Sequence, residues 1–213
     1  MKRIIVAIAL VMATTAAMAQ NGQWTKPQEQ PSMQQRQQER QKPANPDTDP
    51  KYLAGAVPEV DGRIVFSKTI AAPGKSASEV YTLMLQRLQQ LTHEEDQIQS
   101  QVAIVNQTAR EIGATFEEWL VFKKNALVLD RSRFYYTVHV ACKDGSADVT
   151  INRLRYLYEE ERDPQKYNAE EWISDREALN KTKTKLVRMS AKFRRKTVDR
   201  MEQLFNEFTK ALQ

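Results

Sequence analysis

The sequence predicts an α+β protein with a single antiparallel β-sheet of about five to six strands and two helices packed on one face. Two Asp-Gly dipeptides, Asp61-Gly62 and Asp144-Gly145, each lie between segments of alternating hydrophobicity, which is the pattern of β-hairpins. Two amphipathic segments, in turn, begin with a Ser-x-x-Glu capping box. Helices combined with one antiparallel sheet predict a two-layer α+β domain.

The domain is predicted to span residues 52–213. In "VPEVDGRIVFSKTI", Ile64, Phe66 and Ile70 alternate with more polar positions, as expected for a half-buried strand. The following "APG" ends that strand. In "SASEVYTLMLQRLQQL", Ser76 and Glu79 form the first capping box, and the later apolar residues recur at helical spacing. We therefore expect a hairpin followed by a helix.

Two shorter segments, "QVAIVN" and "EIGATFEEWLVF", are predicted to be strands, and "KKNALVLDRS" an irregular connection. The long hairpin comes next, with its turn at Asp144-Gly145. This turn places Val140 opposite Val149 and Val138 opposite Ile151. One face then collects Phe134, Tyr136, Val138, Val140, Cys142, Val149 and Ile151. The other, open face collects Tyr135, Thr137, His139, Asp148, Thr150, Asn152 and Tyr156.

The C-terminal region carries the second capping box, from Ser174 to Glu177, and is predicted to be helical from there to Leu212. One continuous helix of this length exceeds a small sheet, so we expect a bend or break between Asn180 and Lys185. The residues expected on its core-facing stripe are Leu186, Ser190, Phe193, Thr197, Met201, Leu204, Phe208 and Leu212.

Four stretches together, "VDGRIVFSKTI", "SASEVYTLMLQRLQQL", "RFYYTVHVACKDGSADVTINRLRY" and "NAEEWISDREALNK", resemble an exported Bacteroides-type family of unknown function. The resemblance covers about residues 57–212. It implies a fold like that of the TATA-binding protein, and it supplies no catalytic or ligand residues. A fold does not determine a function, so this resemblance is no argument for DNA binding.

The N-terminus has the features of a signal peptide over residues 1–19: Lys2 and Arg3, an apolar run, and small residues ending at Ala19. Residues 20–51 are rich in Gln and Pro and predict a disordered linker. These features predict export to the periplasm or cell envelope of a Gram-negative bacterium, with no transmembrane segment after cleavage. The single cysteine, Cys142, excludes an intrachain disulfide and is expected to be a buried strand residue.

The chain has 32 Lys+Arg and 27 Asp+Glu. Without Lys2 and Arg3, which belong to the predicted signal peptide, 30 basic and 27 acidic residues remain, a net charge of +3. Because this net charge is small, any strongly positive surface must come from a local cluster of basic residues. Nine basic residues and one acid lie between Lys181 and Arg200. An exported, mildly basic protein is not expected to bind nucleic acid. The candidate residues for an anionic surface or acidic partner are Arg188, Lys192, Arg195 and Lys196. The alternative is a solvated helix face, with acidic clusters such as Glu117-Glu118 as intramolecular partners.

The open face of the long hairpin suggests a second site, in which Tyr135, His139, Asn152 and Tyr156 form an aromatic and polar platform for a sugar, peptide or partner strand. Ordinary cross-strand pairing on a solvated face explains the same residues. The two histidines, His93 and His139, do not have metal-ligand spacing, and no cofactor or metal is expected.

The leading functional hypothesis is a non-enzymatic binding or scaffolding module of the cell envelope, with an envelope protein or glycan as its partner. The first alternative is a small hydrolase-like enzyme that uses His139 or a carboxylate on the open face. The second is association with an anionic membrane surface through the basic C-terminal helix. The sequence does not separate these three.

Overall fold

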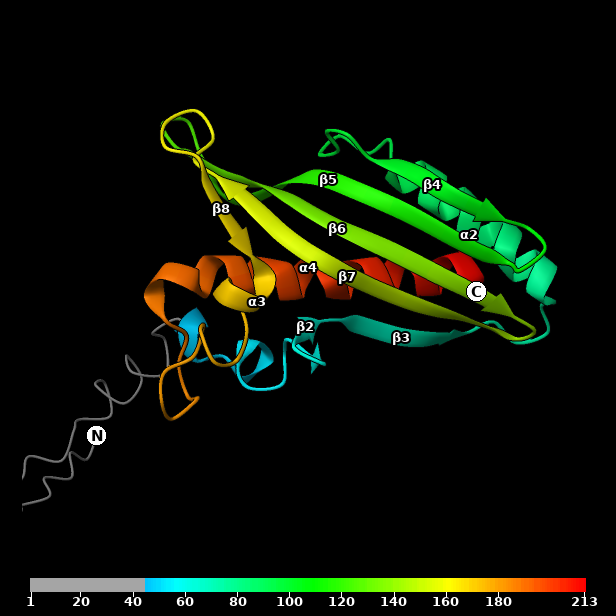
Figure 1. Ribbon diagram of the computed structural model, residues 1–213, viewed down its shortest axis with the longest axis horizontal. Helices are drawn as coiled ribbons and strands as arrows, with labels where there is room; N and C mark the ends of the chain where they lie inside the picture. The colour runs from blue at the N-terminus through cyan, green and yellow to red at the C-terminus, as the bar shows by residue number, and fades with distance from the viewer. Residues whose placement is uncertain (1–44) are drawn as a thin grey trace, which may run out of the picture. The chain divides into compact units, whose positions relative to one another are not determined.

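The computed structural model describes residues 45–213, and the predicted signal peptide and residues 20–44 of the predicted linker lie outside this range. The main sheet is antiparallel and six-stranded (Figure 1). In spatial order it contains β3 (Phe66–Ala71), β7 (Ser146–Tyr158), β6 (Leu129–Lys143), β5 (Glu111–Lys124) and β4 (Gln101–Asn106). The short strand β8 (Gln165–Asn168) pairs with the second half of β7, beyond β3.

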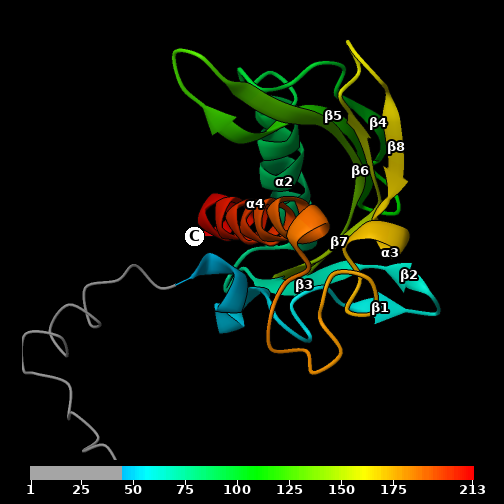
Figure 2. The same cartoon turned by 90° about the vertical axis from the view of Figure 1, so that its left-hand side faces the viewer.

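Two long helices, α2 (Ala77–Leu91) and α4 (Arg188–Leu212), lie on the same face of this sheet. Figure 2 shows the sheet curving around α4, so that the helices occupy its concave side. Val138 and Ile151 from the strands and Phe193 and Leu204 from α4 are all at most 1 % exposed. The predicted class, one antiparallel sheet with two helices on one face, is therefore confirmed.

The turn and capping signals in the sequence form the predicted structures. Asp61 and Gly62 both have positive φ, at 50° and 73°, and they join β1 (Glu59–Val60) to β2 (Arg63–Ile64). This is the backbone for which Asp-Gly is preferred in two-residue hairpins. At the start of α2, Ser76 and Glu79 make both hydrogen bonds of a capping box.

The long hairpin has the predicted register. Lys143 pairs with Ser146 around the turn, Val140 pairs with Val149, and Val138 pairs with Ile151. The stretch expected to be an irregular connection is mostly strand, because β5 extends to Lys124 and β6 begins at Leu129. Only residues 125–128 lie between these two strands.

One face assignment was wrong, that of Tyr156. The β6–β7 register shifts between Tyr135 and Thr137, and opposite this shift Arg153 adopts a left-handed φ of 57°. The extra residue of such a bulge moves every later side chain of the strand to the other face. Leu154 and Tyr156 consequently point into the core, and Arg155 is exposed in place of Tyr156.

The prediction that a helix begins at the second capping box, Ser174 to Glu177, was also wrong. Residues 173–187 form turns, and α4 begins only at Arg188, without a side-chain cap. The Asn180 side chain accepts hydrogen bonds from the amides of Thr184 and Lys185, which stabilises a local turn. The expected interruption between Asn180 and Lys185 is thus part of a longer non-helical segment. The predicted core stripe is buried along its whole length.

Three further features differ from the prediction. Residues 46–52, nearly all of which fall in the predicted linker, form the 3₁₀ turns η1 (Pro46–Thr48) and η2 (Pro50–Tyr52). Asp47 of this segment pairs with Arg195, and Lys51 pairs with Asp199 and Glu202. Strand β8 and the short helix α3 (Ala169–Trp172) lie between the long hairpin and Ser174, in a stretch for which no element was predicted.

Candidate ligand-binding groove on the outer face of the sheet

A groove of about 1010 Å³ lies on the sheet face that the long helices leave uncovered. Its lining comes from β5, β6 and β7, together with the β1–β2 hairpin and the region where β8 passes into α3. Among the lining residues are Arg63, Thr115, Glu117, Tyr135, Thr137, Asn152, Arg153, Arg155 and Asn168. Hydroxyl, amide, guanidinium and phenol groups therefore converge on one concave surface.

Tyr135 and Arg155 form the aromatic part of this groove. They are direct cross-strand partners on β6 and β7, and the Arg155 guanidinium lies 4.9 Å from the centre of the Tyr135 ring. This cation–π contact orients both side chains. Partial burial, followed by the charge of Glu117, raises the pKa of the Tyr135 phenol. The phenol therefore remains protonated at neutral pH and is able to donate a hydrogen bond.

The net free charge in the groove is positive. Three acidic residues line the groove: Glu117 forms an ion pair with Arg133 at 2.7 Å, Glu170 accepts a hydrogen bond from the Ile64 amide at 3.1 Å, and Asp61 is exposed without an ion pair in residues 45–213. Arg63, Arg153 and Arg155 are exposed, and within residues 45–213 none of them forms an ion pair. Arginine binds carboxylate and phosphate through two parallel donors. The groove accordingly suits an anionic ligand better than a cationic one.

The structure brings two of the four predicted platform residues, Tyr135 and Asn152, into this groove. His139 lies further along β6, half exposed between its cross-strand neighbours Gly113 and Thr150, and does not line the groove. Tyr156 lies on the opposite, core-facing side. Its hydroxyl is 2.7 Å from that of Thr197, and burial raises its pKa.

The groove arginines are absent from the sequence-based site for an identifiable reason. Arg155 faces outward only because of the bulge at Arg153, and Arg63 approaches only because the β1–β2 hairpin folds beside the sheet. The left-handed φ of Arg153 is atypical for arginine, so residue type does not indicate it. The Asp61-Gly62 turn is the one signal in the sequence that points to the hairpin.

The second predicted site, on the basic helix, is largely engaged within the fold. Lys192 donates to both carboxylate oxygens of Asp130 at 2.9 and 3.0 Å and to the Tyr158 hydroxyl at 2.7 Å. Arg195 pairs with Asp47. Of the four candidate residues, Arg188 and Lys196 are exposed. The positive charge of this helix therefore serves mainly to attach it to neighbouring segments.

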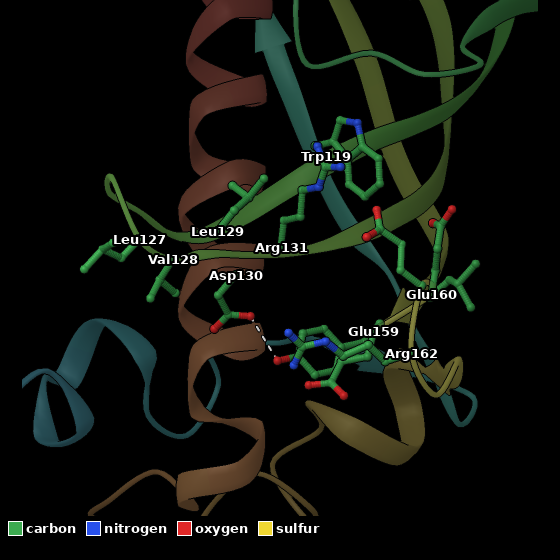
Figure 3. Close-up of a pocket in the computed structure, with 12 residues that line it drawn as sticks. Trp119, Leu127, Val128, Leu129, Asp130, Arg131, Glu159, Glu160 and Arg162 are labelled. Carbon is green, nitrogen blue, oxygen red and sulfur yellow. Dashed lines mark hydrogen bonds between the residues drawn. The ribbon is translucent and has the colours of Figure 1, made fainter.

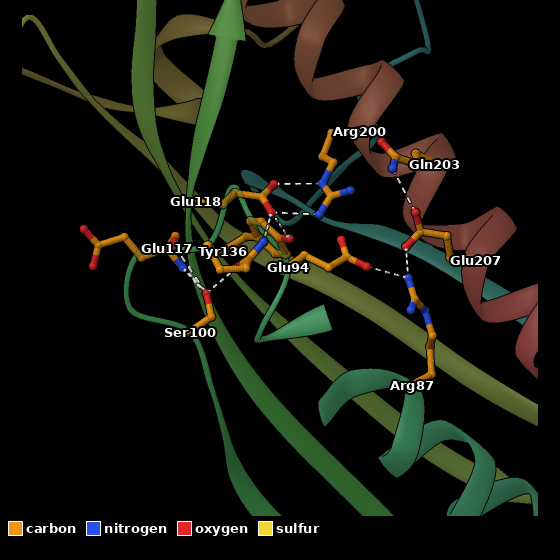
Figure 4. Close-up of polar contacts among 10 residues, drawn as sticks. Arg87, Glu94, Ser100, Glu117, Glu118, Tyr136, Arg200, Gln203 and Glu207 are labelled. Carbon is orange, nitrogen blue, oxygen red and sulfur yellow. Dashed lines mark hydrogen bonds and ion pairs between the residues drawn. The ribbon is translucent and has the colours of Figure 1, made fainter. Parts of the chain in front are cut away.

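A buried polar network attaches α4 to the sheet at a second place (Figure 4). Arg200 donates to both oxygens of Glu118 on β5, and Glu118 also accepts from the Tyr136 hydroxyl at 3.1 Å and the Gln97 side chain at 2.6 Å. Glu118 is 2 % exposed, and its carboxylate is satisfied by donors from three elements of the chain. This arrangement is that of a structural ion pair. The acidic pair Glu117-Glu118 thus does include a partner of the basic helix.

Within the described range, no group of three or more His, Cys, Asp or Glu side chains has the geometry of a metal site. Cys142 is 7 % exposed, and burial raises the pKa of its thiol to about 11, so at neutral pH it is a thiol rather than a thiolate. None of the helices in residues 45–213 is long and apolar enough to span a membrane.

Comparison with known proteins identifies the family. A crystal structure of a DUF4468 family protein from Bacteroides ovatus is 43 % identical to this chain, with a TM-score of 0.71. The match covers 76 % of this chain and 93 % of that one. The chain belongs to the DUF4468 family. The model of this family, described as "Domain of unknown function (DUF4468) with TBP-like fold", matches residues 66–157, which run from β3 nearly to the end of β7.

A second solved structure, a TBP-like protein from Parabacteroides distasonis, shares the fold of this DUF4468 protein at 17 % identity and a TM-score of 0.60. That match covers 74 % of this chain and 97 % of the other. A search of curated proteins found no match. The resemblance drawn from the sequence, to a Bacteroides-type family with a TATA-binding-protein-like fold, is confirmed.

Proposed function

We propose that this DUF4468 protein is an exported, non-enzymatic binding module of the cell envelope, and that its outer-face groove binds an extended anionic ligand. The observation that carries the proposal is the convergence of Arg63, Arg153 and Arg155 on a groove that also presents Tyr135 and Asn152. The guanidinium groups supply charge complementarity, whereas the phenol and amide groups supply directional hydrogen bonds.

A groove of this kind fits binding better than catalysis. His139, the residue on which the hydrolase alternative rests, lies outside the groove, and its cross-strand neighbours are a glycine and a threonine. Two of the three groove acids, Glu117 and Glu170, are held by Arg133 and by a backbone amide, and the third, Asp61, lies in the β1–β2 turn. Such groups position a bound molecule: Glu117 and Glu170 already accept hydrogen bonds within the fold, and no histidine lies among the lining residues beside them.

Calorimetric titration with polygalacturonate, an anionic polysaccharide, and with neutral dextran tests the ligand class. We expect heat of binding from the anionic polymer alone, and at least a roughly tenfold weaker affinity for Arg155→Gln, since a charge-assisted contact contributes about 1.5–3 kcal/mol. Arg176→Gln, an exposed arginine paired with Glu177, is the matched control and should bind like the natural protein. Equal binding by Arg155→Gln and the natural protein would contradict the assignment of the groove.

Export rests on the residues that precede the described range, "MKRIIVAIALVMATTAAMAQ". Fractionation of cells producing the full chain, followed by N-terminal sequencing, checks it. We expect the protein in the periplasmic or envelope fraction with Gln20 as its first residue. Recovery of a chain that still begins at the initiating methionine in the cytosolic fraction would reject export.

A further inference from the structure

The exposed apolar side chains of this protein gather at one end. Eight large apolar residues are exposed within the described range, and five of them lie in two short segments: Leu127, Val128 and Leu129 at the β5–β6 connection and the first residue of β6, and Val187 and Met189 at the start of α4. Both segments lie at the same end of the molecule, the left in Figure 1 and the near side in Figure 2. The contact of Lys192 with Asp130 joins α4 to β6 beside them.

Leu127 is 95 % exposed, the highest exposure of any large apolar side chain in residues 45–213. Its loop is nevertheless well ordered by hydrogen bonds. The Asn125 side chain accepts from the amides of Leu127 and Val128 at 3.0 and 2.8 Å, and the Asn125 amide donates to the Val128 carbonyl at 2.9 Å. The loop is therefore preorganised to present Leu127 to the solvent.

Lysine and arginine flank both apolar segments. Lys123 and Lys124 precede the loop, and Lys185 and Arg188 surround Val187. All four are exposed, and none forms an ion pair among the described residues. Apolar tips flanked by basic side chains match the interface of a bilayer, where acyl chains take the apolar groups and lipid phosphates the cations.

We propose that this end of the molecule docks on a phospholipid surface, with Leu127 and Met189 entering the headgroup layer. The contact shares only Arg188 with the site that the sequence suggested along the basic helix, because Lys192 and Arg195 are paired within the fold. Only the first turn of α4 takes part, and the loop between β5 and β6 forms the other half of the surface.

Insertion of apolar groups is the main source of affinity in this arrangement. Figure 3 shows the loop residues Leu127, Val128 and Leu129 on one side of a cleft of about 560 Å³ and Glu159 and Glu160 on the other. Glu160 pairs with Arg133, whereas Glu159, Glu161 and Asp163 are exposed and oppose the attraction of the lysines to an anionic surface. We therefore expect membrane binding that decreases only modestly with salt.

Cosedimentation of the mature full chain with vesicles of phosphatidylethanolamine and phosphatidylglycerol tests the proposal. We expect the natural protein to sediment with the vesicles, Leu127→Asp to lower the partition coefficient at least roughly tenfold, and Lys123→Gln to lower it less. The control is Val105→Asp. Val105 lies on β4, away from this surface, and is about as exposed as Leu129, so this variant should sediment like the natural protein. Thermal unfolding of each variant confirms that it is folded.

A second measurement locates the contact independently of affinity. Cys142 is buried with a raised thiol pKa, so Leu127→Cys supplies the one reactive thiol of the described chain for an environment-sensitive fluorophore. Addition of vesicles should shift the emission of this label to the blue and leave a label at Val105→Cys unchanged. The proposal is overturned by absence of sedimentation of the natural protein, by unchanged sedimentation of Leu127→Asp, or by complete loss of binding at high salt, which indicates charge alone.

Discussion

Arg200 of α4 and Glu118 of β5 form a two-point ion pair, with Nε–Oε1 and Nη2–Oε2 distances of 2.8 Å each. Their side chains are 13 % and 3 % exposed. Hydrogen bonding to Glu118 together with the nearby negative charges raises the pKa of the guanidinium despite its burial. The pair holds the helix over the sheet, because any sliding of α4 would separate two desolvated charges.

Removal of one member of this pair should be strongly destabilising. We expect Arg200→Met to lower the free energy of unfolding by about 3–5 kcal/mol, because it leaves the Glu118 carboxylate buried and uncompensated. The double variant Glu118→Gln/Arg200→Met should recover a large part of that loss. Urea denaturation checks both variants. Arg176→Met, whose arginine is exposed, should change stability by less than about 0.5 kcal/mol; an equal effect at both positions would refute this explanation.

Arg194 should anchor the segment around Tyr52 and Leu53 to α4. It is fully buried, and its guanidinium donates to the carbonyls of Tyr52, Leu53 and Ile173 and to the Asp175 carboxylate, each at 2.6 Å. Arg194→Met leaves these acceptors without a donor, so we expect a loss of about 3 kcal/mol in unfolding free energy.

Hydrogen exchange separates a local effect of this substitution from a global one. The amides of Tyr52 and Ala56, which bond to nearby carbonyls, should exchange faster in Arg194→Met than amides in the centre of β6. Arg195→Met is the matched control and should have a smaller effect, because the Arg195 side chain is 25 % exposed whereas that of Arg194 is fully buried. Uniform acceleration over the whole chain would show that Arg194 does not act on this segment in particular.

Phe193 should be the most sensitive apolar position of α4. Its ring lies 4.6 Å from that of Phe122 and 5.2–5.9 Å from those of Tyr156, Tyr158, Tyr167 and Trp172. We expect Phe193→Ala to cost about 3–5 kcal/mol of unfolding free energy, through the cavity that it leaves between helix and sheet. Phe205→Ala, at a half-buried position on the same helix, should cost less in the same urea experiment. The reverse order would show that the aromatic cluster is not what holds α4.

The capping box of α2 should contribute a pH-dependent stability. Ser76→Ala is expected to cost about 1 kcal/mol at neutral pH. Hydrogen bonds from the Ser76 backbone amide and hydroxyl lower the pKa of Glu79, so its contribution is present above the ordinary carboxyl pKa and is lost as the pH falls through the lowered one. Glu79→Gln should therefore be less stable than the natural protein at neutral pH and closer to it at about pH 3. A difference that does not change with pH would exclude this linkage.

Local signals in the sequence predicted most of the strands and helices correctly. Asp-Gly turns, strict alternation around Val138 and Val149, and the Ser76–Glu79 capping box each act within a few residues, and the structure has all of them. Ser174 and Glu177 carry the same capping signature, but the segment after them forms turns. The strand-like bridge between Leu179 and Leu186 and the bonds of Asn180 compete with the helix there.

The candidate site was only half predicted, for a reason that lies in the backbone. Alternation assigns a face to every strand residue from the turn onward, and it placed Tyr135 and Asn152 correctly. A single bulge at Arg153 reverses the assignment for the rest of β7, so that Tyr156 enters the core and Arg155 joins the groove. The presence of such a bulge depends on how β6 and β7 pair over their full length, and short sequence windows do not contain this information.

The sequence by itself determined the fold class and the register of the central hairpin, because hydrophobic periodicity and turn chemistry act between near neighbours, and its resemblance to known sequences indicated the family. Tertiary structure alone decided which charges of the basic helix are engaged, which strand residues face outward beyond the bulge, and where the exposed apolar loops gather. Those outcomes depend on residues far apart in the chain, such as Arg194 with Tyr52 and Arg200 with Glu118, whose encounter requires the folded sheet.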